Sequence, residues 1–168
     1  MLKVQDDYKR WIQQLNLIAH PEGGFFCETY RSEDLILPPS RYQGKRTAGT
    51  AIYYLLRSED FSAFHKVNSD EIWHFYAGSR LILYVIKPNG DMEIKKIGYD
   101  TDGSAYFQAT VKANQWFAAE VDEKNSYALV GCTVSPGFDF EDFVLGDRKN
   151  LTKTYPQHTQ LITRLTHP

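Results

Sequence analysis

The stretch of the chain that says most about its fold is residues 62–78, which read SAFHKVNSDEIWHFYAG. His65 lies near the end of one expected strand, Glu71 begins the next, and a tight turn separates them. Successive side chains of a strand point to opposite faces, so we expect Glu71 to share a face with Trp73 and Phe75, and His74 to lie on the other. We predict that this hairpin directs His65 and Glu71 into the mouth of one barrel.

On both sides of this stretch the chain reads as short strands separated by turns. Runs rich in aromatic and β-branched residues alternate with turn residues, which is typical of a sandwich or barrel. Strands are expected at residues 25–31, 47–56, 63–67, 71–76, 81–86, 92–97, 105–111, 115–120 and 127–134. The pair Asn89–Gly90 indicates a hairpin between two of them, and residues 32–46 are expected to form a long loop.

Two helical patterns flank the strands. Apolar residues spaced as on one helix face, among them Tyr8, Trp11 and Ile12, predict a helix over about residues 3–16. Pro156 is placed to begin a closing helix over about residues 156–165. With a barrel over about residues 24–145, the whole chain of 168 residues is expected to form a single domain.

The composition is that of an ordinary globular protein and excludes several classes of partner. Hydrophobic residues make up 42% and charged residues 24%, and 19 Lys and Arg against 21 Asp and Glu give a net charge of −2. We therefore expect no nucleic-acid partner, which would require a basic footprint, and no membrane span. The absence of a signal-peptide pattern, together with two cysteines that are expected to be reduced thiols, predicts a cytoplasmic protein.

Residues 65–78 resemble the first motif of the cupins, in which His-x-His is followed by Glu and then Gly. His65, Glu71 and Gly78 fit this pattern, but Val67 stands at the second histidine. The second cupin motif normally contains another histidine, and Phe117 takes its place here.

Longer segments resemble one family in particular, the cupin-5 family of single-domain cupins without a characterised function. The segments are HPEGG (20–24), ETYRS (28–32), SDEIWHFY (69–76) and PGFDF (136–140), and the resemblance spans about residues 8–165. It implies an all-β double-stranded β-helix, the cupin jelly roll, with short flanking helices, and commonly a homodimer. Proteins with the same barrel include nucleotide-sugar epimerases, which work without a metal.

The ligand set argues against a metal cofactor. A catalytic metal usually has three protein ligands and an open position, whereas the motif positions supply only His65 and Glu71. We therefore expect no metal and no other cofactor. The alternative is a degraded metal site that recruits a third ligand such as Tyr30.

Four residues are candidates for catalysis. His65 is a candidate base for a proton next to a carbonyl, Glu71 or Asp139 would orient it, and Tyr30 would return a proton. Asp139 is also a candidate partner of His65, in a His–carboxylate dyad like that of the sugar epimerases. The alternative for His65 is a hydrogen-bonded structural role inside the barrel.

The candidate ligand-binding residues lie on three expected strands: Glu28, Arg31, Trp73, Phe75, Trp116 and Phe117. Strand alternation places Phe26, Glu28 and Tyr30 on one face and Thr29 and Arg31 on the other. Arg31 either binds a phosphate or carboxylate or forms a surface ion pair. Trp116 and Phe117 either stack on a sugar or base or belong to the core. Residues 20–24 are interpreted as a turn that sets the first strand.

Three functions follow from these residues. The first is a metal-independent enzyme of the isomerase or epimerase type, acting on a sugar or a nucleotide-linked ligand. The second is a cupin that binds a small molecule without catalysis. The third is a metal-dependent cupin with a degraded metal site.

Overall fold

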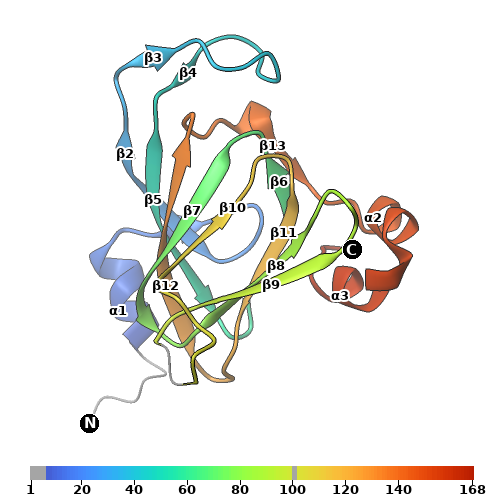
Figure 1. Cartoon of the computed structure of the whole chain (residues 1–168). Helices are drawn as coiled ribbons and strands as arrows, with labels where there is room; N and C mark the ends of the chain where they lie inside the picture. Colours follow the sequence, from blue (N-terminus) through green and yellow to red (C-terminus); the bar gives the residue numbers. More distant parts are fainter. Residues whose placement is uncertain (1–6, 100–101) are drawn as a thin grey trace.

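The computed structural model describes residues 7–99 and 102–168, and in it two antiparallel sheets face each other to form a barrel (Figure 1). The six-stranded sheet has the order β1 (Ile18–Ala19), β2 (Phe25–Arg31), β5 (Thr50–Arg57), β12 (Tyr127–Ser135), β7 (Asp70–Gly78) and β10 (Gln108–Val111). The five-stranded sheet has the order β13 (Phe143–Leu145), β6 (Phe61–Val67), β11 (Trp116–Val121), β8 (Leu81–Ile86) and β9 (Met92–Ile97). The predicted all-β jelly-roll class is confirmed.

Local sequence patterns placed most of these strands well. Strands β2, β8 and β9 have the predicted ends. The hairpin expected at Asn89–Gly90 joins β8 to β9, with Leu81 opposite Ile97 and Ile86 opposite Met92. Gly90 closes this turn with a φ of 87°, in the left-handed region that glycine adopts without strain.

The hairpin predicted for residues 63–76 is wrong, because β6 and β7 do not pair. Strand β6 pairs with β11 and β13, and β7 pairs with β12 and β10. The turn at Asn68–Ser69 therefore carries the chain from one sheet to the other. As a consequence, His65 and Glu71 enter the barrel from opposite sheets.

The space between the sheets holds the main core. Trp73 and Phe117 are 1% and 0% exposed there, and the alternation predicted for β7 is confirmed, with Glu71, Trp73 and Phe75 buried and Ile72 and Tyr76 exposed. The other large buried members of this core include Tyr54, Leu56, Leu81, Leu83, Val85 and Ile97. These residues fill the barrel next to the cavity described below, and Tyr54 also lines that cavity.

Helices cover the outer faces of both sheets (Figure 1). The helices α2 (Arg148–Thr154) and α3 (Thr159–Arg164) bury Leu151 and Ile162 against Phe64 and Ala118 of the five-stranded sheet. Helix α2 is absent from the sequence expectation, and the expected closing helix begins as a 3-10 turn, η3 (Pro156–His158).

At the other sheet, α1 (Asp7–Gln14) packs near Leu17 and Leu55, and the indole N–H of Trp11 donates to the Tyr127 hydroxyl at 3.0 Å. Residues 3–6 of the expected first helix lie outside the described residues. Within the described part of the chain, no helix is long and apolar enough to cross a membrane.

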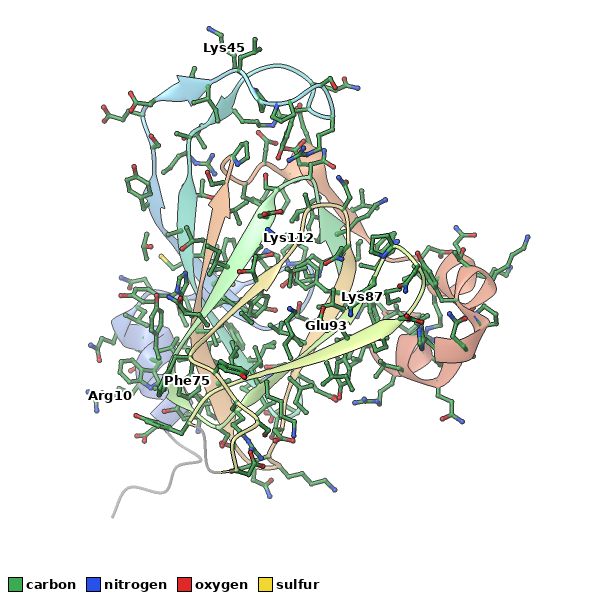
Figure 2. All side chains as sticks on the ribbon, in the orientation of Figure 1. Arg10, Lys45, Phe75, Lys87, Glu93 and Lys112 are labelled. Atoms are coloured by element: carbon green, nitrogen blue, oxygen red, sulfur yellow. The ribbon has the colours of Figure 1, made fainter. Side chains whose placement is uncertain are left out.

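A two-stranded arm, β3 (Leu35–Ile36) paired with β4 (Arg46–Thr47), extends beyond one end of the barrel at the top of Figure 1. It occupies the segment that was expected to be a loop. Leu35 and Leu37 are 65% and 84% exposed, and Figure 2 shows Lys45 at the tip of the arm.

Candidate functional site

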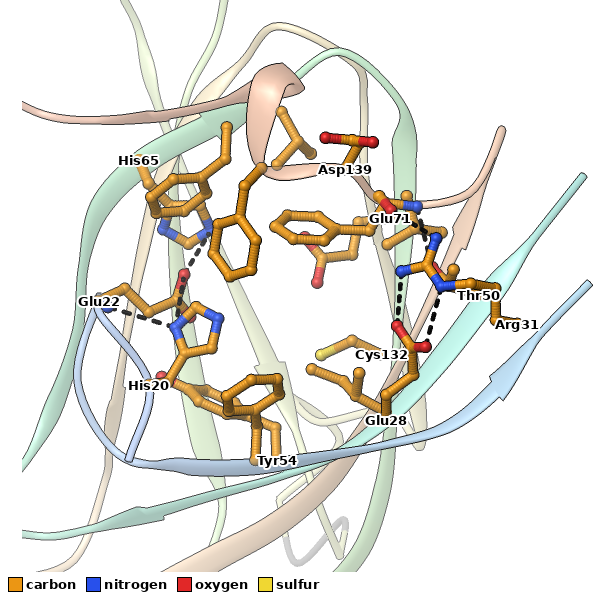
Figure 3. Close-up of a pocket in the computed structure, with 17 residues that line it drawn as sticks. His20, Glu22, Glu28, Arg31, Thr50, Tyr54, His65, Glu71, Cys132 and Asp139 are labelled. Atoms are coloured by element: carbon orange, nitrogen blue, oxygen red, sulfur yellow. Dashed lines mark hydrogen bonds and ion pairs between the residues drawn. The ribbon is translucent and has the colours of Figure 1, made fainter. Parts of the chain in front are cut away.

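Near the arm the barrel encloses a cavity of about 250 Å³ between the two sheets (Figure 3). Its walls come from β2, β5, β6, β7, β12 and β13 and from the segments before β2 and after β12. The polar lining residues are His20, Glu22, Glu28, Arg31, Thr50, Tyr54, His65, Glu71, Cys132 and Asp139. His65 and Glu71, the two residues that the sequence placed in one barrel mouth, both line it.

Glu22 is a buried cavity residue that the sequence analysis did not select as a candidate. The segment 20–24 does form a tight turn before β2, with the Gly23 N–H donating to the His20 carbonyl at 3.0 Å. Gly23 has a φ of 120°, and a Cβ there would lie 2.0 Å from the Phe61 carbonyl oxygen. This close approach to β6 brings Glu22 into the barrel, where it is 6% exposed. The signal in the sequence was a carboxylate directly before two glycines.

His65 is paired with Glu22. Its Nδ1 lies 2.8 Å from the Ala63 carbonyl oxygen, an acceptor, so Nδ1 carries a proton and donates. Its Nε2 lies 3.2 Å from Glu22 Oε2. Two lone pairs would repel each other at this distance, so the pair shares a proton between them. The Ser62 hydroxyl donates to the other Glu22 oxygen at 2.9 Å, and the Phe117 ring packs on the imidazole with the ring centroids 4.0 Å apart.

Glu71 is a buried acid on the opposite wall. It is 7% exposed, and Figure 3 shows its carboxyl pointing toward the middle of the cavity. Burial, and secondarily the charge of Glu22, raise its pKa from 4.5 to about 8. Glu71 is therefore mostly protonated at neutral pH. Burial also raises the pKa of the neighbouring Cys132 thiol, which keeps that thiol protonated.

His20 is a neutral imidazole surrounded by aromatic rings. The backbone N–H of Glu22 donates to its Nδ1 at 3.2 Å, so that nitrogen has no proton. Burial lowers the pKa of His20; the nearby Glu22 carboxylate opposes this shift, and His65 adds to it slightly. Its ring meets Phe26 edge-on with the centroids 4.6 Å apart and also lies near Tyr54, Phe140 and Phe143.

A β-bulge changes the face that the end of β2 presents. The pairing of β2 with β5 shifts between Glu28, opposite Ile52, and Tyr30, opposite Ala51. A bulge adds one residue and reverses the alternation beyond it. Arg31 therefore joins Glu28 at the cavity, whereas Tyr30 is 58% exposed and does not line it. The predicted face of Tyr30 is wrong, and the structure does not bring Tyr30 to His65 and Glu71.

Asp139 lines the cavity but is not the partner of His65. Its side chain accepts a hydrogen bond from the Glu141 N–H at 2.9 Å and caps the 3-10 turn η2 (Phe140–Asp142). Figure 3 shows it at the edge of the cavity, across from the His65–Glu22 pair. The expected pairing of His65 with Asp139 is absent, and the carboxylate beside His65 belongs to Glu22.

The four aromatic candidates for ligand binding are core residues. Trp73, Phe75 and Phe117 belong to the core between the sheets, and Trp116 packs with the cluster under α2 and α3. None of them lines the cavity. The rings that do line it are Phe26, Tyr54, Phe138, Phe140 and Phe143, together with His20.

The described residues do not fit the metal that many cupins hold. Val67 and Phe117, at two motif positions for histidine, carry no ligand atom, and no group of three or more His, Cys, Asp or Glu among the described residues is arranged to hold a metal ion. Tyr30, the suggested third ligand, does not reach the cavity. We therefore derive no step through a metal.

A jelly-roll barrel with a cavity between its two sheets at one end defines this protein as a cupin. Residues 9–146 match the Cupin_5 family, described as Cupin superfamily (DUF985), and the chain belongs to that family. It is 32% identical over 143 residues to the uncharacterized protein YML079W of Saccharomyces cerevisiae. The matched region covers 78% of this chain and 71% of that protein.

Two solved structures resemble the whole chain. Protein SO0799 from Shewanella oneidensis is 37% identical, with a TM-score of 0.86 and 97% of each chain covered. A hypothetical protein from Leishmania major is 32% identical, with a TM-score of 0.88, and 95% of this chain and 98% of that chain are covered. Neither description gives an activity, so the function has to be argued from the cavity.

Proposed function

We propose that this protein binds a small sugar-like molecule in the cavity and isomerises or epimerises it by proton transfer, without a metal. A cavity of about 250 Å³ is at the small end of ligand sites, which range over roughly 300–1,000 Å³. It suits a ligand of about monosaccharide size. If the ligand is nucleotide-linked, the nucleotide has to remain outside the barrel.

The observation that carries this proposal is an acid and a base in the same cavity. Glu71 holds a proton that it can give, since its pKa is about 8. The Glu22–His65 pair holds one shared proton and can accept a second. Titratable groups whose environments drive them to different protonation states are the usual arrangement for acid–base catalysis.

The reaction that uses both groups is enolisation. The Glu22–His65 pair accepts a proton from the carbon next to a carbonyl, while Glu71 donates its proton to the carbonyl oxygen, which gives an enol. The pair then returns its proton to the former carbonyl carbon, and the hydroxyl on the neighbouring carbon gives its proton to Glu71, which completes the isomerisation of a hydroxycarbonyl compound and restores both groups. In this scheme Glu22, and not Asp139, accompanies His65, and Glu71 takes the acid role that was expected for Tyr30.

Incorporation of solvent deuterium tests the proposal. A panel of free and nucleotide-linked sugars would be incubated with the protein in D₂O and followed by proton NMR. We expect carbon-bound deuterium in at least one of them, a rate that falls above about pH 8 as Glu71 ionises, and a loss of about 10²- to 10⁴-fold in Glu71→Gln or His65→Gln.

His74→Gln is the matched control. His74 lies on the outer face of the same sheet, hydrogen-bonded to Thr133 and Gln108, and does not line the cavity. Absence of exchange across the panel, or exchange at the normal rate in folded Glu71→Gln, would refute the enzymatic proposal.

One observation favours binding without catalysis. Both ring nitrogens of His65 already have partners, Ala63 and Glu22, so this imidazole offers no free lone pair to a ligand. If the protein binds its ligand without catalysis, a sugar from the panel would raise the melting temperature of the protein and would be recovered without deuterium.

We also propose that the chain forms a homodimer through the arm β3–β4. Leu35 and Leu37 are largely exposed, and large exposed apolar side chains gathered on one element are typical of an interface.

A further inference from the structure

Apart from the Asp139 carboxylate at its edge, the charges of the cavity are balanced within it. Four carboxyl groups line it, those of Glu22, Glu28, Glu71 and Asp139, and among the described lining residues Arg31 is the single guanidinium and none is a lysine. Counted alone, these groups would make the cavity acidic. Their contacts and protonation states reduce this negative charge, because most of the carboxyl groups are protonated or paired.

The inner groups carry no net charge. The Glu22–His65 pair shares one proton and is neutral as a unit, whichever partner holds that proton. His20 is neutral, because its Nδ1 accepts a hydrogen bond and burial lowers its pKa. Glu71 is protonated at neutral pH, because burial raises its pKa to about 8. The inner wall therefore offers hydrogen-bonding groups without a fixed charge.

At the side of the cavity, three of the five N–H donors of Arg31 are already engaged, including the pair that would bind a two-oxygen anion. Its Nε and Nη2 donate to the two oxygens of Glu28 at 2.9 and 2.6 Å, and its Nη1 donates to the Phe138 carbonyl at 3.2 Å. Figure 3 shows this two-point contact at the edge of the cavity. The geometry is the one with which arginine binds a phosphate or carboxylate ligand, and Glu28 already fills that role.

A charged group finds no free counterpart at the inner wall of this cavity. A phosphate would have to displace Glu28 from Arg31 and would lie near the Asp139 carboxylate. An ammonium group at the inner wall, away from Asp139 at the edge (Figure 3), would be desolvated against the aromatic rings with a protonated Glu71 beside it, and moving an unpaired charge from water into such surroundings is unfavourable. A neutral ring with hydroxyl groups can use the aromatic walls and the hydrogen-bonding groups together.

We propose that the ligand of this cavity is an uncharged sugar or similar hydroxycarbonyl compound, and that Glu28 determines this specificity by occupying Arg31 and excluding phosphorylated forms. The inference rests on the proposed function in one respect, namely that this cavity is the ligand site. It narrows the ligand class to molecules that carry neither a phosphate nor an amino group on the part that enters the barrel.

Three probes that share the same sugar ring but differ in charge test the proposal: D-glucose, D-glucosamine and D-glucose 6-phosphate. Binding is measured at pH 7 by saturation-transfer NMR titration on the full chain. We expect the wild type to bind glucose at least tenfold more tightly than either charged probe. In Glu28→Gln, Arg31 loses its anionic partner, and we expect the affinity for glucose 6-phosphate to rise at least tenfold while that for glucose changes little.

Glu93→Gln is the matched control, because it removes a carboxylate that pairs with Lys95 at 3.2 Å on β9, on a strand that does not line the cavity. It should leave all three affinities unchanged. Glu28 is half-exposed, so its replacement is compatible with folding, which a thermal melt verifies.

The proposal is overturned if a charged probe binds the wild type as tightly as glucose, if Glu28→Gln leaves the preference against phosphate unchanged, or if none of the three probes binds. Failure of the proposed function is recognised separately by the deuterium experiment. Glu71-dependent exchange in a phosphorylated or amino sugar would preserve the isomerase and refute only the choice of ligand.

Discussion

At the scale of single residues, the protonation of Glu71 links the stability of this protein to its chemistry. Its neighbours come from three elements: Trp73 on β7, Cys132 on β12, and Glu22 in the turn before β2. None of them supplies a positive charge, and the proximity of Glu22 adds to the effect of burial on the pKa of Glu71. The sequence correctly indicated that Glu71 faces inward, but the protonation of the carboxyl depends first on its burial and then on Glu22, and the sequence pattern revealed neither.

We predict that Glu71 makes the fold less stable as the pH rises. Its pKa is higher in the folded chain, about 8, than the ordinary value of 4.5, so the folded state binds the extra proton between these values. The free energy of unfolding should therefore fall from about pH 4.5 to about pH 8, by at most about 1.4 kcal/mol per pH unit from this group.

Urea denaturation of the wild type and of Glu71→Gln at several pH values measures this contribution. The difference between the two proteins should shift in favour of the variant as the pH rises and become constant above about pH 8. A difference that does not change with pH would show that Glu71 is ionised in the folded chain.

At the scale of elements, two local irregularities build the site. The bulge in β2 brings Arg31 to Glu28, and the turn at Gly23 and Gly24 brings Glu22 to His65. Strand alternation correctly predicted the faces of β7, because the pairing of this strand is regular next to Glu71. It failed in β2, because the bulge shifts the register of that strand. A bulge arises from pairing with a distant strand, so alternation within one strand cannot reveal it.

We predict that Gly23→Ala destabilises the protein by about 2–6 kcal/mol, since overpacking costs about 1–3 kcal/mol and a strained backbone conformation about as much again. The added Cβ would meet the Phe61 carbonyl oxygen at 2.0 Å. The measurement is the midpoint of urea denaturation.

Gly44→Ala provides the control, because Gly44 also has a positive φ, 89°, but nothing lies within 4 Å of its Cβ position. It should cost about 1 kcal/mol through backbone strain alone. Equal effects of the two substitutions would mean that the contact with Phe61 does not hold the turn in place.

At the scale of the whole molecule, we predict that the chain is a dimer that separates when the apolar surface of the arm becomes charged. Leu37 is 84% exposed, so Leu37→Asp should leave the fold of the monomer intact while burying a charge in the interface. Light scattering coupled to size exclusion should give twice the chain mass for the wild type and the chain mass for the variant.

Ile94→Asp serves for comparison, since Ile94 is also exposed, at 57%, but lies on β9. The Ile94→Asp variant should remain dimeric. A wild-type protein that elutes as a monomer at micromolar concentration would refute the proposed dimer.

The sequence by itself determined the barrel, most of its strands and the inward direction of Glu71, because these depend on side-chain alternation and turn residues that act over a few positions. Membership of the cupins was indicated by the resemblance of its motifs to those of the family. Only the tertiary structure decided the partner of His65, the occupation of Arg31, the core role of Trp73 and Phe117, and the covering helix α2. Each of these depends on contacts between segments far apart in the chain, which form when the two sheets close on each other. The physical reason is that local conformational preferences set the elements, whereas the burial of a carboxylate or an aromatic ring is set by what packs against it from elsewhere in the fold.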